Sequence, residues 1–116
     1  VKLGETAEQA VVREVREELG VTAKITRPLW LSQAFFTEDV DGSRYHELCL
    51  YFWMDISETD LLARGNTFIR TEGAHVHTFE WQAFDRLKDE YFYPIFLKKE
   101  IFTLPKELTL RTDVED

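Results

Sequence analysis

The chain has 116 residues, of which 44% are hydrophobic, 14% aromatic and 31% charged, a size and composition typical of a single globular domain. Lys and Arg number 14 and Asp and Glu number 22, and the resulting net charge of −8 argues against a nucleic-acid backbone as partner. No apolar run approaches the ~20 residues of a membrane span, and the single Cys49 suits a reducing cytoplasm, so we expect one cytoplasmic domain over residues 1–116 that binds neither nucleic acid nor a membrane.

The first predicted element is a helix over Ala7–Leu19. Thr6 to Gln9 has the form of a capping box, in which the Thr6 hydroxyl and the Gln9 side chain bond each other's backbone amides. Gly20 is the expected residue just past the helix C-terminus, where glycine adopts the left-handed conformation. Both ends of this helix are therefore predicted from local signals.

The next third of the chain is rich in β-branched and aromatic residues and predicts strands. Val21–Phe36 is expected to form one strand, or two strands interrupted at Pro28. Thr37–Arg44 reads as a polar turn. Tyr45–Ile56 is apolar on both alternating faces, which predicts a central strand covered on both sides.

The second half of the chain gives weaker signals. Ser57–Thr71 is expected to be a loop with a short helix, and His77–Trp81 a strand followed by a turn or short helix through Leu87. Tyr93–Leu104 predicts an amphipathic helix, and the tail after Pro105 is expected to be irregular. The pattern as a whole predicts an α/β (α+β) fold with a mixed sheet between helices.

The first helix carries three glutamates on one face. Successive helix residues turn by ~100°, which places Glu18 at roughly +40° and Glu17 at roughly −60° from Glu14. Carboxylates at these spacings repel each other, whereas a divalent cation removes the repulsion, and Mg²⁺ prefers oxygen ligands. The other interpretation is a solvated charged face, which is the usual explanation of an isolated glutamate pair. The cluster of three favours a metal site.

The run from Gly4 to Val21 resembles the Nudix box, whose pattern is Gly-x5-Glu-x7-Arg-Glu-U-x-Glu-Glu-x-Gly-U, with U a bulky aliphatic residue. Every fixed position from the first glutamate onward is matched, by Glu5, Arg13, Glu14, Val15, Glu17, Glu18, Gly20 and Val21. The first glycine of the box would fall two residues upstream of Val1. The resemblance therefore implies a Nudix domain whose first strands are missing from this chain.

The resemblance implies a MutT-like hydrolase with an α/β/α sandwich fold. Such enzymes use Mg²⁺ or Mn²⁺ and an activated water to cleave the diphosphate linkage of a nucleoside diphosphate joined to another moiety. Metal ions can neutralise a diphosphate and lower the pKa of a bound water, which reconciles an acidic chain with an anionic substrate. The sequence does not determine the oligomeric state, and a homodimer is one possibility.

Residue roles follow from the resemblance by position. Glu17 and Glu18 would be the principal metal ligands, and Glu14 a further ligand or the base that activates water. Arg13 would orient the glutamates by hydrogen bonding. The loop–helix junction and the helix end would be supported by Glu5, Gly4 and Gly20.

Many Nudix domains supply one more glutamate from a downstream loop, as a metal ligand or base. Glu72 is the best candidate, because Glu-Gly shortly before a strand ending in Glu-Trp resembles the family arrangement. Glu80 is the second candidate and Glu47 the third. For each of them alone, a surface or structural role is an equal alternative.

Two other functions on the same fold are open. One is a Nudix-like module that senses a nucleotide without cleaving it, and the other is an isomerase of the isopentenyl diphosphate type, which would use Cys49 and a glutamate to move protons. A zinc site is not favoured, since His46, His75 and His77 lack the spacing of a closed zinc site. These residues are better interpreted as ordinary strand histidines.

Overall fold

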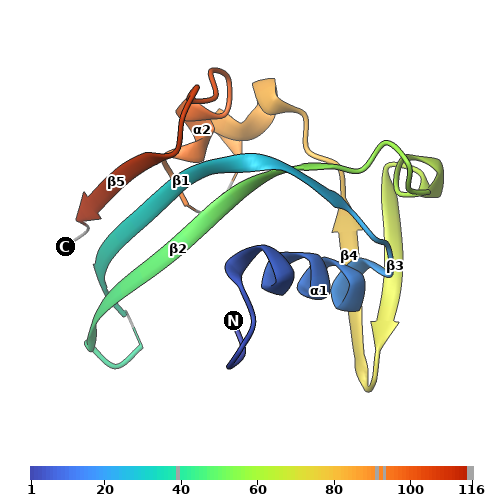
Figure 1. Cartoon of the computed structure of the whole chain (residues 1–116), viewed down its shortest axis with the longest axis horizontal. Helices are drawn as coiled ribbons and strands as arrows, with labels where there is room; N and C mark the ends of the chain where they lie inside the picture. Colours follow the sequence, from blue (N-terminus) through green and yellow to red (C-terminus); the bar gives the residue numbers. More distant parts are fainter. Residues whose placement is uncertain (39, 91, 93, 115–116) are drawn as a thin grey trace. The chain divides into compact units, whose positions relative to one another are not determined.

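We describe a computed structural model of the chain over residues 1–38, 40–90, 92 and 94–114. The elements in chain order are α1 (Ala7–Leu19), β1 (Lys24–Thr37), β2 (Arg44–Asp55), η1 (Leu62–Arg64), β3 (Thr67–Glu72), β4 (His75–Glu80), η2 (Phe84–Asp89), α2 (Leu97–Glu100) and β5 (Thr109–Val114), as drawn in Figure 1. They divide into two compact units. The first unit comprises residues 1–24 and 55–104, and the second comprises residues 25–54 and 105–116. The fold is α+β with a mixed sheet, as the sequence predicts.

The second unit is the mixed sheet, with the strand order β2-β1-β5. β1 and β5 are parallel, with Trp30 opposite Thr109. β1 and β2 form an antiparallel hairpin (Figure 1). Across it the Phe35 ring stacks on His46, with 4.2 Å between ring centroids. Leu29 and Trp30 of the central strand are 6% and 3% exposed. The core of this unit therefore lies along β1.

The expected strands of this unit occur: of the two alternatives for Val21–Phe36 the single strand is correct, and one other expectation, the central position of β2, is wrong. β1 runs unbroken through Pro28, and the turn after it is closed by Glu38 N–H donating to the Ser43 carbonyl at 2.7 Å, although Asp39 lies outside the described residues. β2 matches the predicted Tyr45–Ile56 strand, but it lies at an edge of the described sheet. The prediction of a central strand was wrong because apolar residues on both faces indicate packing above and below a strand. They do not indicate whether a neighbouring strand pairs with each of its edges.

The tail after Pro105 is also not irregular as predicted, because it contains β5. The sequence of this strand alternates weakly: four of its six residues are exposed, and the other two, Arg111 and Asp113, are charged. It is ordered by parallel pairing with residues 30–35 of β1, far away in the sequence. Pairing of this kind leaves little trace in local composition.

In the first unit, α1 has the bounds that the sequence predicts. Thr6 Oγ1 accepts from the Gln9 amide at 3.1 Å, and Gln9 Oε1 accepts from the Thr6 amide at 2.9 Å, which completes the capping box. Gly20 has φ +74°, and its N–H donates to the Arg16 carbonyl at 2.9 Å. Ala10 is the fully buried position of the helix.

β3 and β4 form an antiparallel hairpin in the same unit, with Phe68 opposite Phe79 and Glu72 opposite His75. β4 includes most of the expected strand, and η1 is the short helix expected within Ser57–Thr71. β3 replaces the remainder of that expected loop. The loop prediction was wrong because β3 depends on its partner strand, which stacks its Phe79 on Phe68 with 5.3 Å between ring centroids.

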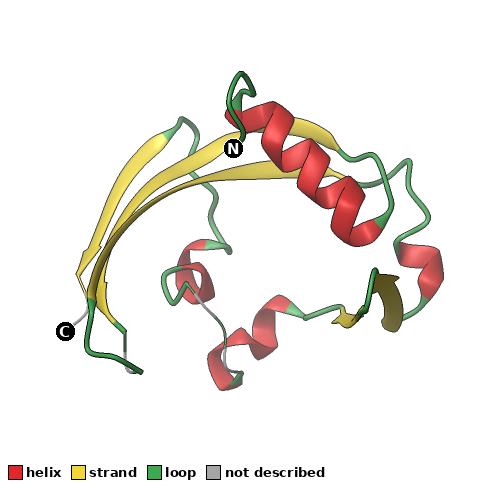
Figure 2. Cartoon of the chain, turned by 90° about the horizontal axis from the view of Figure 1, so that it is seen from below, coloured by secondary structure: helices red, strands yellow, loops and turns green. Residues whose placement is uncertain are grey.

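The predicted helix Tyr93–Leu104 is reduced to α2, Leu97–Glu100, and Tyr93 itself lies outside the described residues. Phe96 precedes α2 and provides no side-chain cap, so the apolar spacing alone does not sustain a long helix. η2 agrees with the turn or short helix expected through Leu87. Figure 2 shows how short these segments are beside α1, and no helix in the described part of the chain is both long and apolar enough to span a bilayer.

Candidate active site on helix α1

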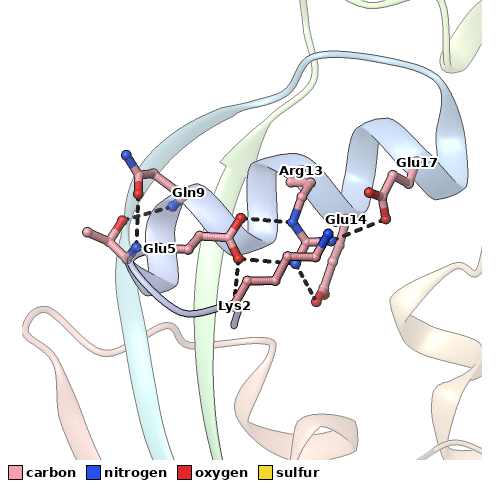
Figure 3. Close-up of polar contacts among 7 residues, drawn as sticks. Lys2, Glu5, Gln9, Arg13, Glu14 and Glu17 are labelled. Carbon is pink, nitrogen blue, oxygen red and sulfur yellow. Dashed lines mark hydrogen bonds and ion pairs between the residues drawn. The ribbon is translucent and has the colours of Figure 1, made fainter.

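The chain enters α1 through a tight turn at Gly4. Gly4 has φ +78°, which favours glycine, and nothing lies within 4 Å of the place where its Cβ would be. The Glu5 amide donates to the Lys2 carbonyl at 3.0 Å, and the Lys2 amide donates to Glu5 Oε1 at 2.9 Å. The turn thereby brings the Glu5 carboxylate alongside the first turns of the helix (Figure 3).

Glu5 and Arg13 form a two-pronged ion pair. Arg13 Nε donates to Glu5 Oε2 at 2.8 Å, and Nη2 donates to Oε1 at 3.2 Å. The Arg13 side chain is 25% exposed and the Glu5 side chain 15% exposed. The hydrogen bonds from Arg13 and then that from the Lys2 amide lower the pKa of Glu5 to about 2, and the same pairing raises the pKa of Arg13. Glu5 is therefore a fixed anion at neutral pH.

The same guanidinium reaches two of the predicted metal ligands. Arg13 Nη1 donates to Glu17 Oε2 at 3.2 Å, and Nη2 lies 3.7 Å from Glu14 Oε1 (Figure 3). The Glu14 and Glu17 side chains are 53% and 50% exposed. The Arg13 guanidinium thus links the half-buried Glu5 carboxylate at the helix start to the exposed carboxylates of Glu14 and Glu17.

These carboxylates match a metal ion in donor type but are not grouped around one point in the described structure. Glu14, Glu17 and Glu18 are all exposed on α1 and offer only oxygen donors, which are the ligands that Mg²⁺ prefers. Within the described ranges, no three His, Cys, Asp or Glu side chains are grouped so that they could hold a metal ion, and Glu14 and Glu17 turn toward Arg13. The donor type therefore fits, and exposed side chains can change rotamer on a ps–ns timescale. The predicted roles of these residues remain predictions.

Two arginines that sequence analysis did not single out contact the end of α1. Arg64 Nη1 donates to the Leu19 carbonyl at 2.8 Å, and Arg70 Nη2 donates to the Glu17 carbonyl at 3.5 Å. They come from η1 and β3, 45 and 53 residues further along the chain. No local pattern identifies them, because nothing in the sequence indicates which distant cation meets a helix C-terminus.

The downstream glutamate candidates occupy different places. Glu72 is exposed at the end of β3, two residues beyond Arg70 and therefore on the same face of the hairpin. Glu80 is exposed on β4 opposite Thr67, on the other face. Because Arg70 contacts α1, the Glu72 face is the one that turns toward the helix. Glu47 lies on β2 in the other unit.

The histidines behave as strand residues in the described structure. His46 stacks on Phe35 in the mixed sheet. His75 and His77 lie two positions apart on β4, with 6.2 Å between their ring centroids. Cys49 is a half-buried free thiol on β2.

Comparison with known families accounts for this combination of an acidic helix face and a paired arginine. The family model of the NUDIX domain matches residues 1–100, which include α1 and the β3–β4 hairpin. The chain belongs to the Nudix family. No curated protein matches it.

Nudix membership supports a pyrophosphohydrolase-type function in general. Enzymes of the Nudix family hydrolyse phosphorus-containing anhydrides, act on nucleoside diphosphate derivatives and generally use divalent metal ions. The residues of the Nudix box lie on one helix of this chain, on the turn that leads into it and just past its C-terminus.

Proposed function

We propose that the chain is a MutT-like, Mg²⁺- or Mn²⁺-dependent pyrophosphohydrolase that cleaves the diphosphate linkage of a nucleoside diphosphate joined to another moiety. The observation that carries the proposal is the unbroken Nudix box from Glu5 to Val21, with its arginine in contact with three of its carboxylates. We further propose that residues 1–116 act as one domain in the cytoplasm.

Glu17 and Glu18 are the residues that would hold the cation, and Glu14 would be a further ligand or the base. A bound divalent ion supplies charge neutralisation to the diphosphate and lowers the pKa of a coordinated water. The carboxylates would provide oxygen donors from a single helix face, which keeps their spacing fixed. Exposure of Glu14 and Glu17 to half or more of their surface leaves the donors accessible from solvent.

The charge balance of the helix supports a role for a cation. Between Gly4 and Gly20 the five glutamates Glu5, Glu8, Glu14, Glu17 and Glu18 bring five negative charges, and Arg13 and Arg16 bring two positive charges. Three negative charges remain in one helix region, which would repel a diphosphate. A divalent cation offsets most of this charge and places a positive centre where the substrate must bind.

Arg13 would act on the glutamates rather than on the substrate. It donates to Glu17 and lies 3.7 Å from Glu14, and its bonds to Glu5 anchor the guanidinium to the helix start. Removing a group that orients a metal ligand in this way typically lowers metal affinity or activity by about 10- to 100-fold. We therefore assign Arg13 and Glu5 to positioning, with Gly4 and Gly20 shaping the two ends of the helix.

Glu72 is the proposed additional catalytic group, because it shares a hairpin face with Arg70, which contacts α1. Glu72→Gln should reduce turnover more than Glu80→Gln, since Glu80 lies on the opposite face. Equal activity in the two variants would remove Glu72 from the mechanism.

The test of the proposal is Glu17→Gln, which keeps the shape of the side chain and removes its charge. Activity against a panel of nucleoside diphosphate compounds should fall by at least about 100-fold with Mg²⁺ present. Glu8→Gln is the matched control, because Glu8 is an exposed glutamate in the first turn of the same helix.

Full activity in Glu17→Gln would refute the assignment. Product analysis separates the alternatives: nucleotide binding without cleavage at any metal concentration would favour a sensing module. Conversion of a substrate with its phosphate bonds intact would favour the isomerase.

A further inference from the structure

The last turn of α1 carries Glu17 and Glu18 and ends against two cationic side chains. Arg64 donates to the Leu19 carbonyl at 2.8 Å, and Arg70 donates to the Glu17 carbonyl at 3.5 Å. The last four carbonyls of a helix lack partners within the helix and form the negative end of its dipole. The two guanidinium groups therefore satisfy free acceptors and complement the charge at the end where two proposed metal ligands lie.

Gly20 allows one of these groups to come close. Its φ of +74° suits glycine, and a Cβ at this position would lie 2.8 Å from Cζ of Arg70. Glycine at this position therefore serves two purposes: it ends the helix in the left-handed conformation, and it leaves space for the guanidinium. The second purpose depends on a residue outside the Nudix box.

Both arginines are held by their surroundings. Arg64 pairs with Asp60 at 2.8 Å and lies over the Phe68 ring, 5.3 Å from its centroid. Phe68 in turn stacks on Phe79 across the hairpin. Arg70 is two residues beyond Phe68 on the same strand face, and its Nε is buried without a hydrogen-bond partner in the described structure. Protein atoms therefore enclose this nitrogen, although burying an N–H without an acceptor is itself unfavourable.

We propose that Arg70 is a positioning residue for the metal-binding carboxylates of α1. By holding the Glu17 carbonyl against the β3–β4 hairpin, it fixes the last turn of the helix. It thereby fixes the points from which the Glu17 and Glu18 side chains extend, while Arg64 anchors the Leu19 carbonyl. The inference rests on the proposed function, because these positions matter only if the two carboxylates hold a divalent cation.

The experiment measures metal binding directly, by titrating Mn²⁺ into the purified protein and following the EPR signal of the free ion. Arg70→Met keeps most of the length of the side chain and removes its charge and donors. It should weaken Mn²⁺ binding by about 10-fold or more, and Arg70→Lys, which keeps the charge, should recover part of the loss. Arg86→Met is the matched control, because the Arg86 side chain is 65% exposed in η2 and lies 3.7 Å from Glu90. It should bind Mn²⁺ as the wild type does.

A role limited to stability would give a different result. In that case Arg70→Met would lower the melting temperature, but the folded protein would bind Mn²⁺ with unchanged affinity, and the inference would be overturned. If Arg70→Met does not fold, Arg70→Lys decides: weakened Mn²⁺ binding supports the inference, and unchanged binding overturns it.

The same titration distinguishes this inference from the proposed function. A wild-type protein that binds Mn²⁺ and hydrolyses a nucleoside diphosphate derivative, together with unaffected Arg70 variants, would leave the proposed function standing and overturn the inference alone. A wild-type protein that neither binds Mn²⁺ nor hydrolyses any such compound would overturn both.

Discussion

The two ends of α1 are held in different ways. The N-terminal end is closed by contacts between residues three to eight positions apart: the capping box of Thr6 and Gln9 and the ion pair of Glu5 and Arg13. The C-terminal end has a local cap, Gly20, and is also contacted by Arg64 and Arg70, 45 and 53 residues away. The contacts of the first end are therefore all local, whereas those of the second are complete only when η1 and the β3–β4 hairpin are folded against the helix.

Of the substitutions that compare the two ends of α1, replacing Arg13 should have the largest effect, because Arg13 connects the N-terminal end of α1 to Glu17 in the last turn. Arg13→Met should reduce kcat/KM by about 10- to 100-fold, as expected when a group that orients metal ligands is removed. Arg16→Met is the control, since Arg16 is exposed on the same helix. Equal kcat/KM for the two variants would show that the local network does not serve the site.

The two glycines at the ends of α1 give a matched pair of substitutions. Gly4 and Gly20 both have positive φ, at +78° and +74°, but a Cβ at Gly4 meets nothing, and one at Gly20 meets Arg70. Gly4→Ala should cost about 1 kcal/mol of unfolding free energy through backbone strain alone. Gly20→Ala should cost about 1 kcal/mol more, because the guanidinium must move away from the Glu17 carbonyl.

Urea denaturation midpoints measure this difference. The steric part of the Gly20 effect is small, since the end of an arginine side chain can move aside, and the lost hydrogen bond is the larger part. Equal losses for the two variants would mean that Arg70 contributes nothing to the end of the helix.

Thr6→Ala tests the N-terminal end of α1 by itself. Loss of the hydroxyl that accepts from the Gln9 amide should destabilise the protein by about 1 kcal/mol in urea denaturation. Thr22→Ala, at an exposed position outside the helix, should change stability by less than about 0.5 kcal/mol. A similar loss in both variants would indicate that the cap is not what stabilises this end.

The smallest expected effect is a change in acid sensitivity. Arg13 lowers the pKa of Glu5 from its usual 4.5 to about 2 in the folded protein. Because the folded pKa is the lower one, the stabilisation by Glu5 is fully present above pH 4.5 and is lost as the pH falls toward 2.

Glu5→Gln should therefore show a shallower loss of stability over this pH interval, measured by thermal melts at a series of pH values. Arg13→Met should give the same shallow profile, because without the guanidinium the Glu5 carboxyl returns toward its usual pKa. A wild-type slope in both variants would contradict the role assigned to the pair.

The sequence predicts α1 well because all its signals are local. The capping residues Thr6 and Gln9 and the terminating Gly20 lie next to the helix that they bound, and the helix has the predicted bounds Ala7–Leu19. The contact of Arg13 with Glu17 is likewise an i,i+4 pair, visible in the spacing. This part of the candidate site could be read without a structure.

Other parts could not be predicted because they depend on distant partners. β3 requires β4, and β5 requires β1, so their residues show little strand character by themselves. The expected helix Tyr93–Leu104 failed for the opposite reason: its apolar spacing was present, but Phe96 gives α2 no side-chain cap. Arg70 belongs to the first group, since only the folded hairpin brings it to Gly20.

The guanidinium of Arg13 has consequences beyond holding the helix start. It uses Nε and Nη2 for the shielded carboxylate of Glu5 and a separate nitrogen, Nη1, for the exposed carboxylate of Glu17. It therefore acts as an internal counterion whose bonds to Glu5 use other nitrogens than its bond to Glu17. Glu17 can leave it without dismantling the entry to the helix, and it can return to it without any movement of the backbone.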